Sequence, residues 1–289
     1  MNRPLDAGTP EGFRAERLVD VLVPTRNRPA ELAVTLAGLA AQEGVDGFGV
    51  VVSDQSDGDP GYAHPAAATM VRALRHRGHP VLLTRRLPRR GLAEHRASLL
   101  AASAARYVLN LDDDVWLEPG TLRRLVTAIG ELGCGFVGNA VHGLSYLDDV
   151  RPDTHRHYAE WTGRPVPERI RPGSPEWDRA RIHSAANLLH VTEAVRLRPG
   201  EWRAYRVSWV GGCVLYDRAK LVDCGGFDFW RSVAENHQGE DVAAQLAVLA
   251  RHGGAGVLPS GAFHLESPTT VTDRDVEAWE VVLADGQAG

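Results

Sequence analysis

Residues 107–114 read Tyr-Val-Leu-Asn-Leu-Asp-Asp-Asp, an apolar run that ends directly in three carboxylates. An apolar run of this length, bounded by polar residues, is typical of a buried strand, so we expect a strand over Tyr107–Leu111. Three earlier runs have the same character, and two of them also end in polar clusters. The strands predicted in this way are Leu18–Val23, Val50–Ser53 and Val81–Thr84.

Helical patterns separate these strands. Pro29 can occupy the first turn of a helix that carries Leu32, Leu36 and Leu39 on one face. A second helix is predicted from Leu92 to Ala105, and a third opens at Pro119. Alternating strands and helices indicate βαβ units and a largely parallel sheet with flanking helices. Ligands bind outside the carboxyl ends of such strands, where the polar clusters lie.

The pattern breaks down over Leu144–Arg206, which is rich in Arg, His, Pro and Trp. We expect loops and short helices there, inserted over the edge of the sheet. Beyond it the predicted elements are a strand, two helices and two short strands. Their ranges are Ser208–Tyr216, Arg218–Val222, Asp241–Arg251, Gly256–Leu258 and Ala262–Leu265, and the tail after Asp285 is predicted to be disordered.

Bulk composition excludes several classes of protein. The chain has 289 residues, 44% hydrophobic, which suffices for one large α/β domain. A net charge of -5 argues against a nucleic-acid-binding surface. Lys220 is the only lysine, which excludes a GxxxxGK phosphate loop. No apolar stretch approaches the roughly 20 residues of a membrane span, and we expect no integral membrane segment and a cytoplasmic protein.

The three cysteines are Cys134, Cys213 and Cys224, and none belongs to a CxxC pair. This spacing disfavours a structural zinc site and a disulfide framework, and it favours small buried side chains.

The acidic triplet is the most informative chemical feature. If strand alternation continues through it, Asp112 and Asp114 lie on one side and Asp113 on the other. Two carboxylates held together repel each other, and a hard divalent cation such as Mg²⁺ or Mn²⁺ relieves the repulsion while bridging to substrate phosphates. The alternative is a solvated acidic turn without a metal.

An ordered set of motifs surrounds the triplet. Along the chain come Val23–Pro29, Val51–Asp54, Gly91 with Arg96, the triplet itself, Gly225–Asp228, Gly239–Asp241 and His264. From about Leu18 to Glu266 this set resembles the family 2 glycosyltransferases. The resemblance implies the GT-A fold, a Rossmann-like and mostly parallel sheet with an acceptor-side insertion. It also implies an inverting transfer of a sugar from a nucleoside-diphosphate donor.

The implied domain organisation is an N-terminal extension over 1–17, a GT-A domain over 18–270 and a C-terminal tail over 271–289. Within the domain, residues 18–142 would bind the nucleotide and residues 143–270 would form the acceptor side.

On the donor side, the resemblance assigns Pro24, Thr25 and Arg28 to the base and ribose pocket and Asp54 to the nucleobase. A turn cap after a strand is the other explanation for Asp54. Arg96 would lie near the diphosphate, unless it is simply a helix-surface arginine. The residues left in the implied nucleotide-sugar site are Asp112, Asp113, Gly211 and Gly212, although the glycines also fit a strand bulge.

The implied metal ligands are Asp114, Asp112 and His264, with Mn²⁺ or Mg²⁺ as the cofactor. The implied catalytic pair is Asp241, as general base, and Glu240, which would contact the donor sugar or hold the loop. Carboxylates in a first helical turn are also explained by the helix dipole alone. The sequence does not decide which of the two is the base.

The donor nucleotide is expected to be UDP, with GDP and dTDP as alternatives, and the acceptor is unidentified. A QxxRW signature of processive polymerases is absent after Asp241, so a single transfer to a soluble or peripheral acceptor is expected. One competing reading is a sugar-nucleotide nucleotidyltransferase, disfavoured because Pro24–Pro29 is poor in glycine. Another is a non-catalytic relative that binds a nucleotide sugar or a glycan, disfavoured by the retained carboxylates and histidine.

Overall fold

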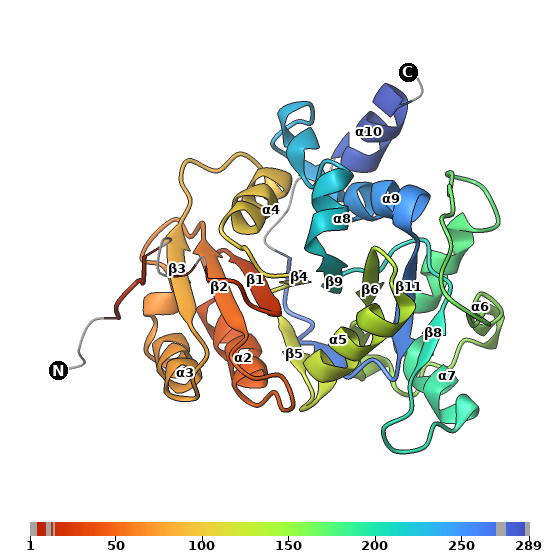
Figure 1. Ribbon diagram of the computed structural model, residues 1–289, viewed down its shortest axis with the longest axis horizontal. Coiled ribbons are helices and arrows are strands. Elements are labelled where there is room, and N and C mark those ends of the chain that lie inside the picture. Colours follow the sequence, from red (N-terminus) through yellow and green to blue (C-terminus); the bar gives the residue numbers. More distant parts are fainter. Residues whose placement is uncertain (1–4, 10–12, 14, 270–275, 287–289) are drawn as a thin grey trace.

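The computed structural model describes residues 5–9, 13, 15–269 and 276–286, and its centre is an eight-stranded sheet (Figure 1). The strand order is β3-β2-β1-β4-β9-β6-β11-β8. These strands are β1 (Val19–Thr25), β2 (Gly49–Asp54), β3 (Val81–Arg85), β4 (Tyr107–Leu111), β6 (Phe136–Gly138), β8 (Arg203–Tyr205), β9 (Cys213–Asp217) and β11 (Gly254–Leu258).

Strands β3, β2, β1 and β4 pair in parallel, as do β6 and β11. Strand β9 runs antiparallel between β4 and β6, and β8 closes the edge antiparallel to β11. The predicted α/β class, with a mostly parallel sheet flanked by helices, is therefore confirmed. All four strands predicted in the first half of the chain are present: Tyr107–Leu111 has the predicted bounds, and the bounds of the other three differ by at most two residues.

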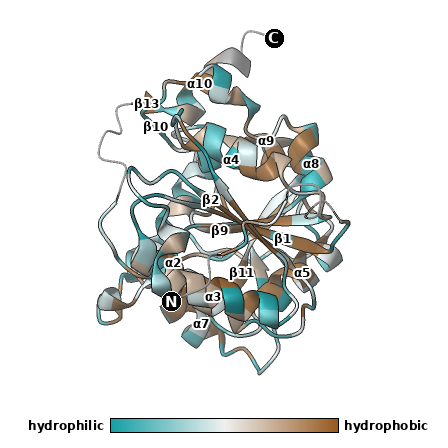
Figure 2. Ribbon diagram, turned by 90° about the vertical axis from the view of Figure 1, so that its left-hand side faces the viewer, coloured by the Kyte–Doolittle hydropathy of each residue, from teal (hydrophilic) through white to brown (hydrophobic). Residues whose placement is uncertain are grey.

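Helices cover both faces of this sheet (Figures 1 and 2). Strand alternation divides the core between them: Val50 and Val52 of β2 belong to one hydrophobic cluster and Val51 to the other. The first cluster contains the apolar faces of α2 (Pro29–Ala40), α3 (Pro65–His76) and α5 (Thr121–Leu132). The second contains those of α4 (Leu92–Ala101), α8 (Arg218–Asp223) and α9 (Glu240–His252).

Two smaller sheets lie beside the main one. The first has the order β5-β12-β7, built from Val115–Leu117, Ala262–His264 and His142–Gly143. Strand β12 brings His264 opposite Val115, directly after the acidic triplet. The second pairs β10 (His237–Gln238) with β13 (Val276–Glu277).

The insertion predicted over Leu144–Arg206 consists of loops and short helices, with β8 at the sheet edge, as expected. Its helices are the 3-10 helices Leu144–Tyr146 and Trp177–His183, α6 (Pro152–His155) and α7 (Asn187–Val195). Two further 3-10 helices are Gly61–Ala63 and Asp228–Arg231.

Three predicted elements differ from the structure. The strand predicted from Ser208 begins only at Cys213, because Gly212 has φ +76°, a left-handed conformation that interrupts extended backbone. The helix predicted to reach Ala105 ends at Ala101. The helix predicted to open at Pro119 starts at Thr121, after the left-handed Gly120.

Residues 276–286, assigned to a C-terminal tail, form β13 and α10 (Ala278–Gly286), and α10 packs against α9. The disorder predicted after Asp285 concerns mainly residues 287–289, which lie outside the described residues, as do residues 1–4, 10–12, 14 and 270–275. Among the described helices, none has the length and apolar character needed to cross a membrane.

Candidate active site

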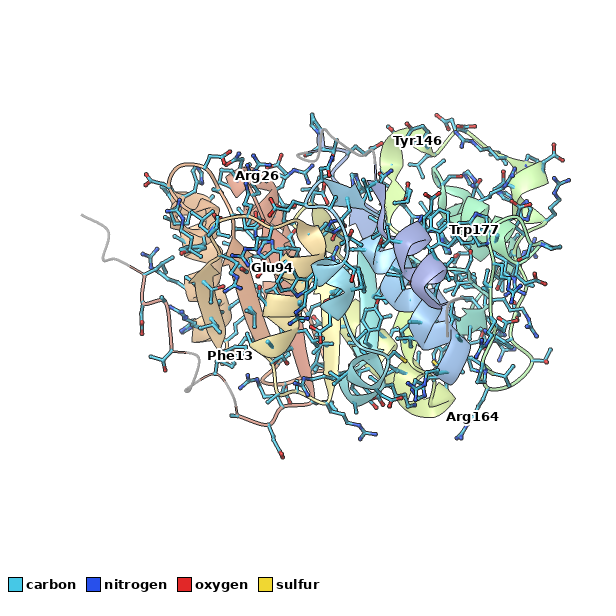
Figure 3. The ribbon with its side chains drawn as sticks, turned by 90° about the horizontal axis from the view of Figure 1, so that it is seen from above. Phe13, Arg26, Glu94, Tyr146, Arg164 and Trp177 are labelled. Atoms are coloured by element: carbon cyan, nitrogen blue, oxygen red, sulfur yellow. The ribbon has the colours of Figure 1, made fainter. Side chains whose placement is uncertain are left out.

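A cavity of about 1130 Å³ lies at the carboxyl ends of β1, β2 and β4. Arg26, which follows β1, and Tyr146 of the insertion lie along the same edge of the molecule, opposite Phe13 and Arg164 (Figure 3). Of the site residues predicted from sequence, those that line the cavity are Pro24, Thr25, Arg28, Asp112, Asp113, Asp114 and His264.

Asp113 is buried and faces the end of β1. Its Oδ2 accepts a hydrogen bond from the Thr25 hydroxyl at 2.6 Å, and its Oδ1 lies 3.2 Å from Arg28 Nη1. The Thr35 hydroxyl of α2 donates to its backbone carbonyl at 2.8 Å. Burial raises the pKa of the Asp113 carboxyl to about 7, against the opposing effect of the Thr25 hydrogen bond. Asp113 therefore fastens the acidic turn to β1 and α2.

Asp114 Oδ2 lies 2.5 Å from Arg28 Nη1 and 3.5 Å from His264 Nε2. Burial, followed by repulsion from Asp112, raises the pKa of Asp114 above its usual range. Arg28 was assigned to the base and ribose pocket, and the structure pairs it with both Asp113 and Asp114. The triplet forms a turn between β4 and β5 rather than a continuation of the strand. The expected placement of Asp113 and Asp114 on opposite sides is therefore wrong, because Arg28 contacts both carboxylates.

Arg96 connects two segments that are far apart in sequence. Its Nη2 donates to Asp112 Oδ1 and its Nε to Glu240 Oε1, both at 2.8 Å. The Arg96 side chain is only 5% exposed, so it is not a helix-surface arginine. Despite its burial, the carboxylates of Asp112 and Glu240 raise the pKa of Arg96, which keeps the guanidinium charged. The bridge thus ties the acidic turn after β4 to the first turn of α9.

Glu240 and Asp241 differ in environment, although they are neighbours in that first turn. Glu240 is buried, and one carboxylate oxygen is held by Arg96. Asp241 is partly exposed, and its Oδ1 accepts from the Val242 backbone N–H at 2.9 Å. A methyl group on the exposed Gly211 would lie 3.9 Å from Asp241 Oδ2. Burial, followed by repulsion from Glu240, raises the pKa of Asp241 to about 7.

Gly212 lies against the acidic turn. Its carbonyl accepts the Asp112 backbone N–H at 3.0 Å. A Cβ at this position would come within 2.8 Å of Val141, and φ is +76°, so glycine is required here for the backbone itself. This explains the glycine without reference to a ligand.

Asp54 does not line the cavity. It is fully buried, its Oδ1 accepts from the Ser56 N–H at 2.7 Å, and its Oδ2 accepts from the Gly61 N–H at 2.8 Å. Both oxygens therefore cap the turn after β2, which is the alternative explanation given by the sequence. The neighbouring Gln55 lines the cavity instead.

The carboxylates of Asp112 and Asp114 are the groups that could hold a divalent cation, although Arg28 and His264 already contact one Asp114 oxygen. Burial, followed by repulsion from Asp112, raises the pKa of Asp114, and a nearby cation would stabilise its charged form. Within the described part of the chain, Asp112, Asp114 and His264 do not bring three ligand atoms within 4.8 Å of one another. An ion here would take its protein ligands from Asp112 and Asp114, and substrate phosphates would have to complete its shell, which is common for Mg²⁺.

His264 fits such an ion less directly than the carboxylates do. Its Nδ1 accepts the Glu266 backbone N–H at 2.8 Å, which leaves the proton of the neutral ring on Nε2, facing Asp114. Coordination through Nε2 would require that proton to leave.

A second group of possible ligands lies on the outer surface, where Asp223, Cys224 and His252 bring their ligand atoms within 4.8 Å. Asp223 already pairs with Arg251 at 3.0 Å and with His252 at 2.9 Å, so ion pairing accounts for the group.

Among the cavity-lining residues that sequence reasoning did not assign to the site, three are buried and polar. His237 Nε2 accepts the Ala93 N–H at 3.0 Å at the start of α4. Gln55 and His95 are buried side chains on the wall of the cavity. The alternation of Val51, Ser53 and Gln55 carries a signal for Gln55, because every second residue of β2 faces the same side. His95 has no comparable signal in the sequence.

Comparisons with known proteins identify a family and a fold. The profile of the family described as Glycosyl transferase family 2 matches residues 20–196. No curated protein sequence matches the chain. Among solved structures, S. aureus TarS 1–349 in complex with UDP-GlcNAc matches with 16% identity and a TM-score of 0.54, over 88% of this chain and 60% of that one.

The mannosyltransferase PcManGT from Pyrobaculum calidifontis, solved with GDP-Man and Mn²⁺, matches with 15% identity and a TM-score of 0.53. That match covers 99% of this chain and 68% of the other. The chain spans about 60% of the length of the TarS fragment. At these identities the likeness establishes the fold, and the GT-A fold implied by the motifs is confirmed.

Proposed function

The chain belongs to glycosyl transferase family 2, and from that premise we propose a metal-dependent, inverting transfer of one sugar from a nucleoside-diphosphate donor to a soluble or peripheral acceptor. We further propose that residues 18–142 bind the donor and residues 143–270 form the acceptor side. UDP is the first candidate for the nucleotide, with GDP and dTDP as alternatives. The structures of similar fold that hold UDP-GlcNAc and GDP-Man support a donor of this class.

The donor would occupy the cavity with its base toward β1 and β2 and its diphosphate toward the acidic turn. Pro24, Thr25 and Gln55 line the first of these ends, and Asp112 and Asp114 line the second. Asp113 and Arg28 hold the acidic turn in place, through the hydrogen bond of Asp113 to Thr25 and the ion pair of Arg28 with Asp114. Fixed positions for these carboxylates reduce the reorganisation that binding requires.

Asp114 and Asp112 would hold a divalent ion, Mn²⁺ or Mg²⁺, with His264 beside them. Such an ion supplies positive charge that offsets the charge developing on the departing diphosphate. Its presence in the PcManGT structure supports this part of the proposal.

Asp241 is the proposed general base. Its carboxylate would take the proton from the acceptor hydroxyl or amine as that atom bonds to the anomeric carbon. The bond between the anomeric carbon and the diphosphate oxygen breaks on the opposite side, so the nucleoside diphosphate leaves and the configuration inverts. A pKa raised to about 7 matches a base that must both accept and release a proton near neutral pH.

Glu240 would serve a different role from Asp241. Its carboxylate is committed to Arg96, which favours positioning of the loop over proton transfer. The observation that carries the whole proposal is this bridge: Arg96 joins Asp112, next to the diphosphate end of the cavity, to the turn that bears Asp241.

Proton NMR of donor turnover tests the proposal. The purified protein is incubated with Mn²⁺ and an α-linked UDP- or GDP-sugar, with simple glycosides offered as acceptors and water as the default one. We expect release of the nucleoside diphosphate and a first-formed product with β configuration, recorded before mutarotation. An α product would contradict inversion.

The same samples distinguish the competing functions. Pyrophosphate release from a nucleoside triphosphate and a sugar phosphate would identify a nucleotidyltransferase instead. Tight donor binding with the donor left intact against all acceptors would identify a non-catalytic relative.

A further inference from the structure

Four side-chain nitrogens of cavity-lining residues have no hydrogen-bond partner among the described residues. Two belong to the half-buried Arg26 and Arg28, and the other two belong to residues that are themselves buried: Nε2 of Gln55, a residue 6% exposed, and Nε2 of His95, a residue 2% exposed. Both residues line the cavity. Leaving a buried polar atom unpaired costs free energy, so two such atoms on one wall indicate a ligand that pairs with them.

His95 is fixed in one protonation state. Its ring makes a hydrogen bond to the backbone of Ser53, and because Nε2 has no partner, the bonded nitrogen is Nδ1. Burial, followed by the charge of Arg96, lowers the pKa of His95 to about 3, so the ring is neutral. Nδ1 therefore carries the proton and donates to the Ser53 carbonyl, and Nε2 is a hydrogen-bond acceptor.

Gln55 lies on the same side of β2 as Ser53. Val51 of β2 belongs to the hydrophobic cluster under α4, and alternation sends Ser53 and Gln55 to that face too. The Gln55 backbone N–H donates to the Thr25 carbonyl at 2.9 Å, which extends the pairing of β1 and β2 to this residue. Asp54 faces the other way and caps its own turn with both oxygens.

We propose that Gln55 and His95, rather than Asp54, recognise the nucleobase of the donor. His95 Nε2 accepts the ring N–H of the base, and the Gln55 amide donates to the adjacent carbonyl. This pairing selects a base that carries a ring N–H next to a carbonyl, as uracil, thymine and guanine do. Cytosine presents a lone pair at its ring nitrogen, which would face the lone pair of His95. The inference rests on the proposed function, because it requires a nucleotide donor.

Isothermal titration calorimetry with Mn²⁺ tests this assignment, using UDP, GDP, dTDP and CDP, with inorganic pyrophosphate as a probe that has no base. We expect the wild-type protein to bind at least one of the first three nucleotides, and to bind CDP at least tenfold more weakly than that one. Gln55→Leu and His95→Phe should each weaken the preferred nucleotide at least tenfold. Pyrophosphate affinity should stay within about twofold, which also shows that the variants are folded.

His79→Phe is the matched control. His79 is likewise buried and has a pKa lowered mainly by burial, but it stacks on Phe48 and does not line the cavity. The control should leave nucleotide affinity unchanged. Unchanged nucleotide affinity in both Gln55→Leu and His95→Phe would overturn this inference while the proposed function stood. A wild-type protein that binds no nucleoside diphosphate would instead overturn the proposed function, and the inference with it.

Discussion

Two regions of the molecule are built in different ways. On the proposed donor side, carboxylates are held by arginines that are wholly or largely buried: Arg28 pairs with Asp113 and Asp114, and Arg96 with Asp112 and Glu240. The insertion over 144–206, which belongs to the proposed acceptor side, consists of short helices and loops, and its exposed apolar side chains include Leu144, Tyr146 and Leu147. We therefore expect the proposed donor side to be held rigidly by its ion pairs and the proposed acceptor side to be more adaptable.

The largest expected effect concerns the chemical step. Asp241→Asn should lower kcat by about 10²–10⁴-fold, the usual contribution of a general base. The dissociation constant for the nucleoside diphosphate should change little, because the proposed donor contacts lie at the acidic turn. Steady-state kinetics and calorimetry on the same preparation measure both quantities. If donor affinity fell as much as kcat, Asp241 would contribute to donor binding and the general-base assignment would be wrong.

The next effect concerns the ion pairs that Arg96 makes with Asp112 and Glu240. Arg96→Met leaves the carboxylates of Asp112 and Glu240 without their shared cation, and breaking such a buried pair costs about 3–5 kcal/mol. Urea unfolding should show a loss of that size. Arg231→Met is the control, since its pair with Asp228 is largely exposed and contributes little. Equal free energies of unfolding for Arg96→Met and Arg231→Met would contradict the claim that the Arg96 ion pairs stabilise the proposed donor side.

The pH profile provides a third test. Asp241 must be deprotonated to act, and its pKa is raised to about 7, so kcat/KM should fall as the pH drops below 7, by about tenfold per unit well below the pKa. A bound divalent ion would move this limb to lower pH, because it favours the carboxylate form. If no acidic limb appears above about pH 4, near the ordinary pKa of an aspartate, Asp241 is not the base.

Asp241 should also lower the stability of the folded protein at neutral and alkaline pH. Because the folded pKa of Asp241 lies above its unfolded value of 3.8, this group destabilises the fold increasingly as the pH rises from about 4 to 7, and fully above 7. Asp241→Asn removes that cost. Without metal ions, the variant should therefore unfold at a higher temperature than the wild type at pH 8, and the difference should shrink toward pH 5. A lower midpoint at pH 8 would contradict the assigned shift.

The smallest expected effect lies on the acceptor side. Tyr146 is 44% exposed and belongs to the short 3-10 helix at the start of the insertion. Tyr146→Ala should leave nucleoside-diphosphate affinity within about twofold, as measured by calorimetry. A larger loss would show that the insertion contributes to donor binding.

The sequence predicted the donor side well, because strand periodicity is a local signal. The strands around Val19–Thr25 and Tyr107–Leu111 and the positions of Asp112 and Asp114 at a strand end all follow from short-range patterns. The strand was predicted to run through Gly212, although the Gly211-Gly212 pair also fitted a bulge, and the left-handed conformation of Gly212 interrupts it.

The contacts that assemble the site were not predictable in the same way. Arg28 and Asp114 are separated by 86 residues, and Arg96 and Glu240 by 144. Such pairings depend on how the elements pack, which no local pattern records. The helix at Ala278–Gly286 was missed for the same reason, because it is positioned by its packing against α9.

Thermal unfolding in the presence of nucleotides tests the central claim most directly. The protein is heated with UDP, GDP, dTDP or CMP, each with Mn²⁺, with Mg²⁺ or with EDTA, and the same panel is run on Asp114→Ala and on the surface control Asp223→Ala. At a ligand concentration 100 times the dissociation constant, binding stabilises the native state by about 2.7 kcal/mol, which should raise the midpoint by several degrees.

The account predicts a shift for at least one nucleoside diphosphate that requires the metal, disappears in Asp114→Ala and persists in Asp223→Ala. If no nucleoside diphosphate shifts the midpoint with either metal, the acidic turn after β4 is not a donor site and the account is wrong.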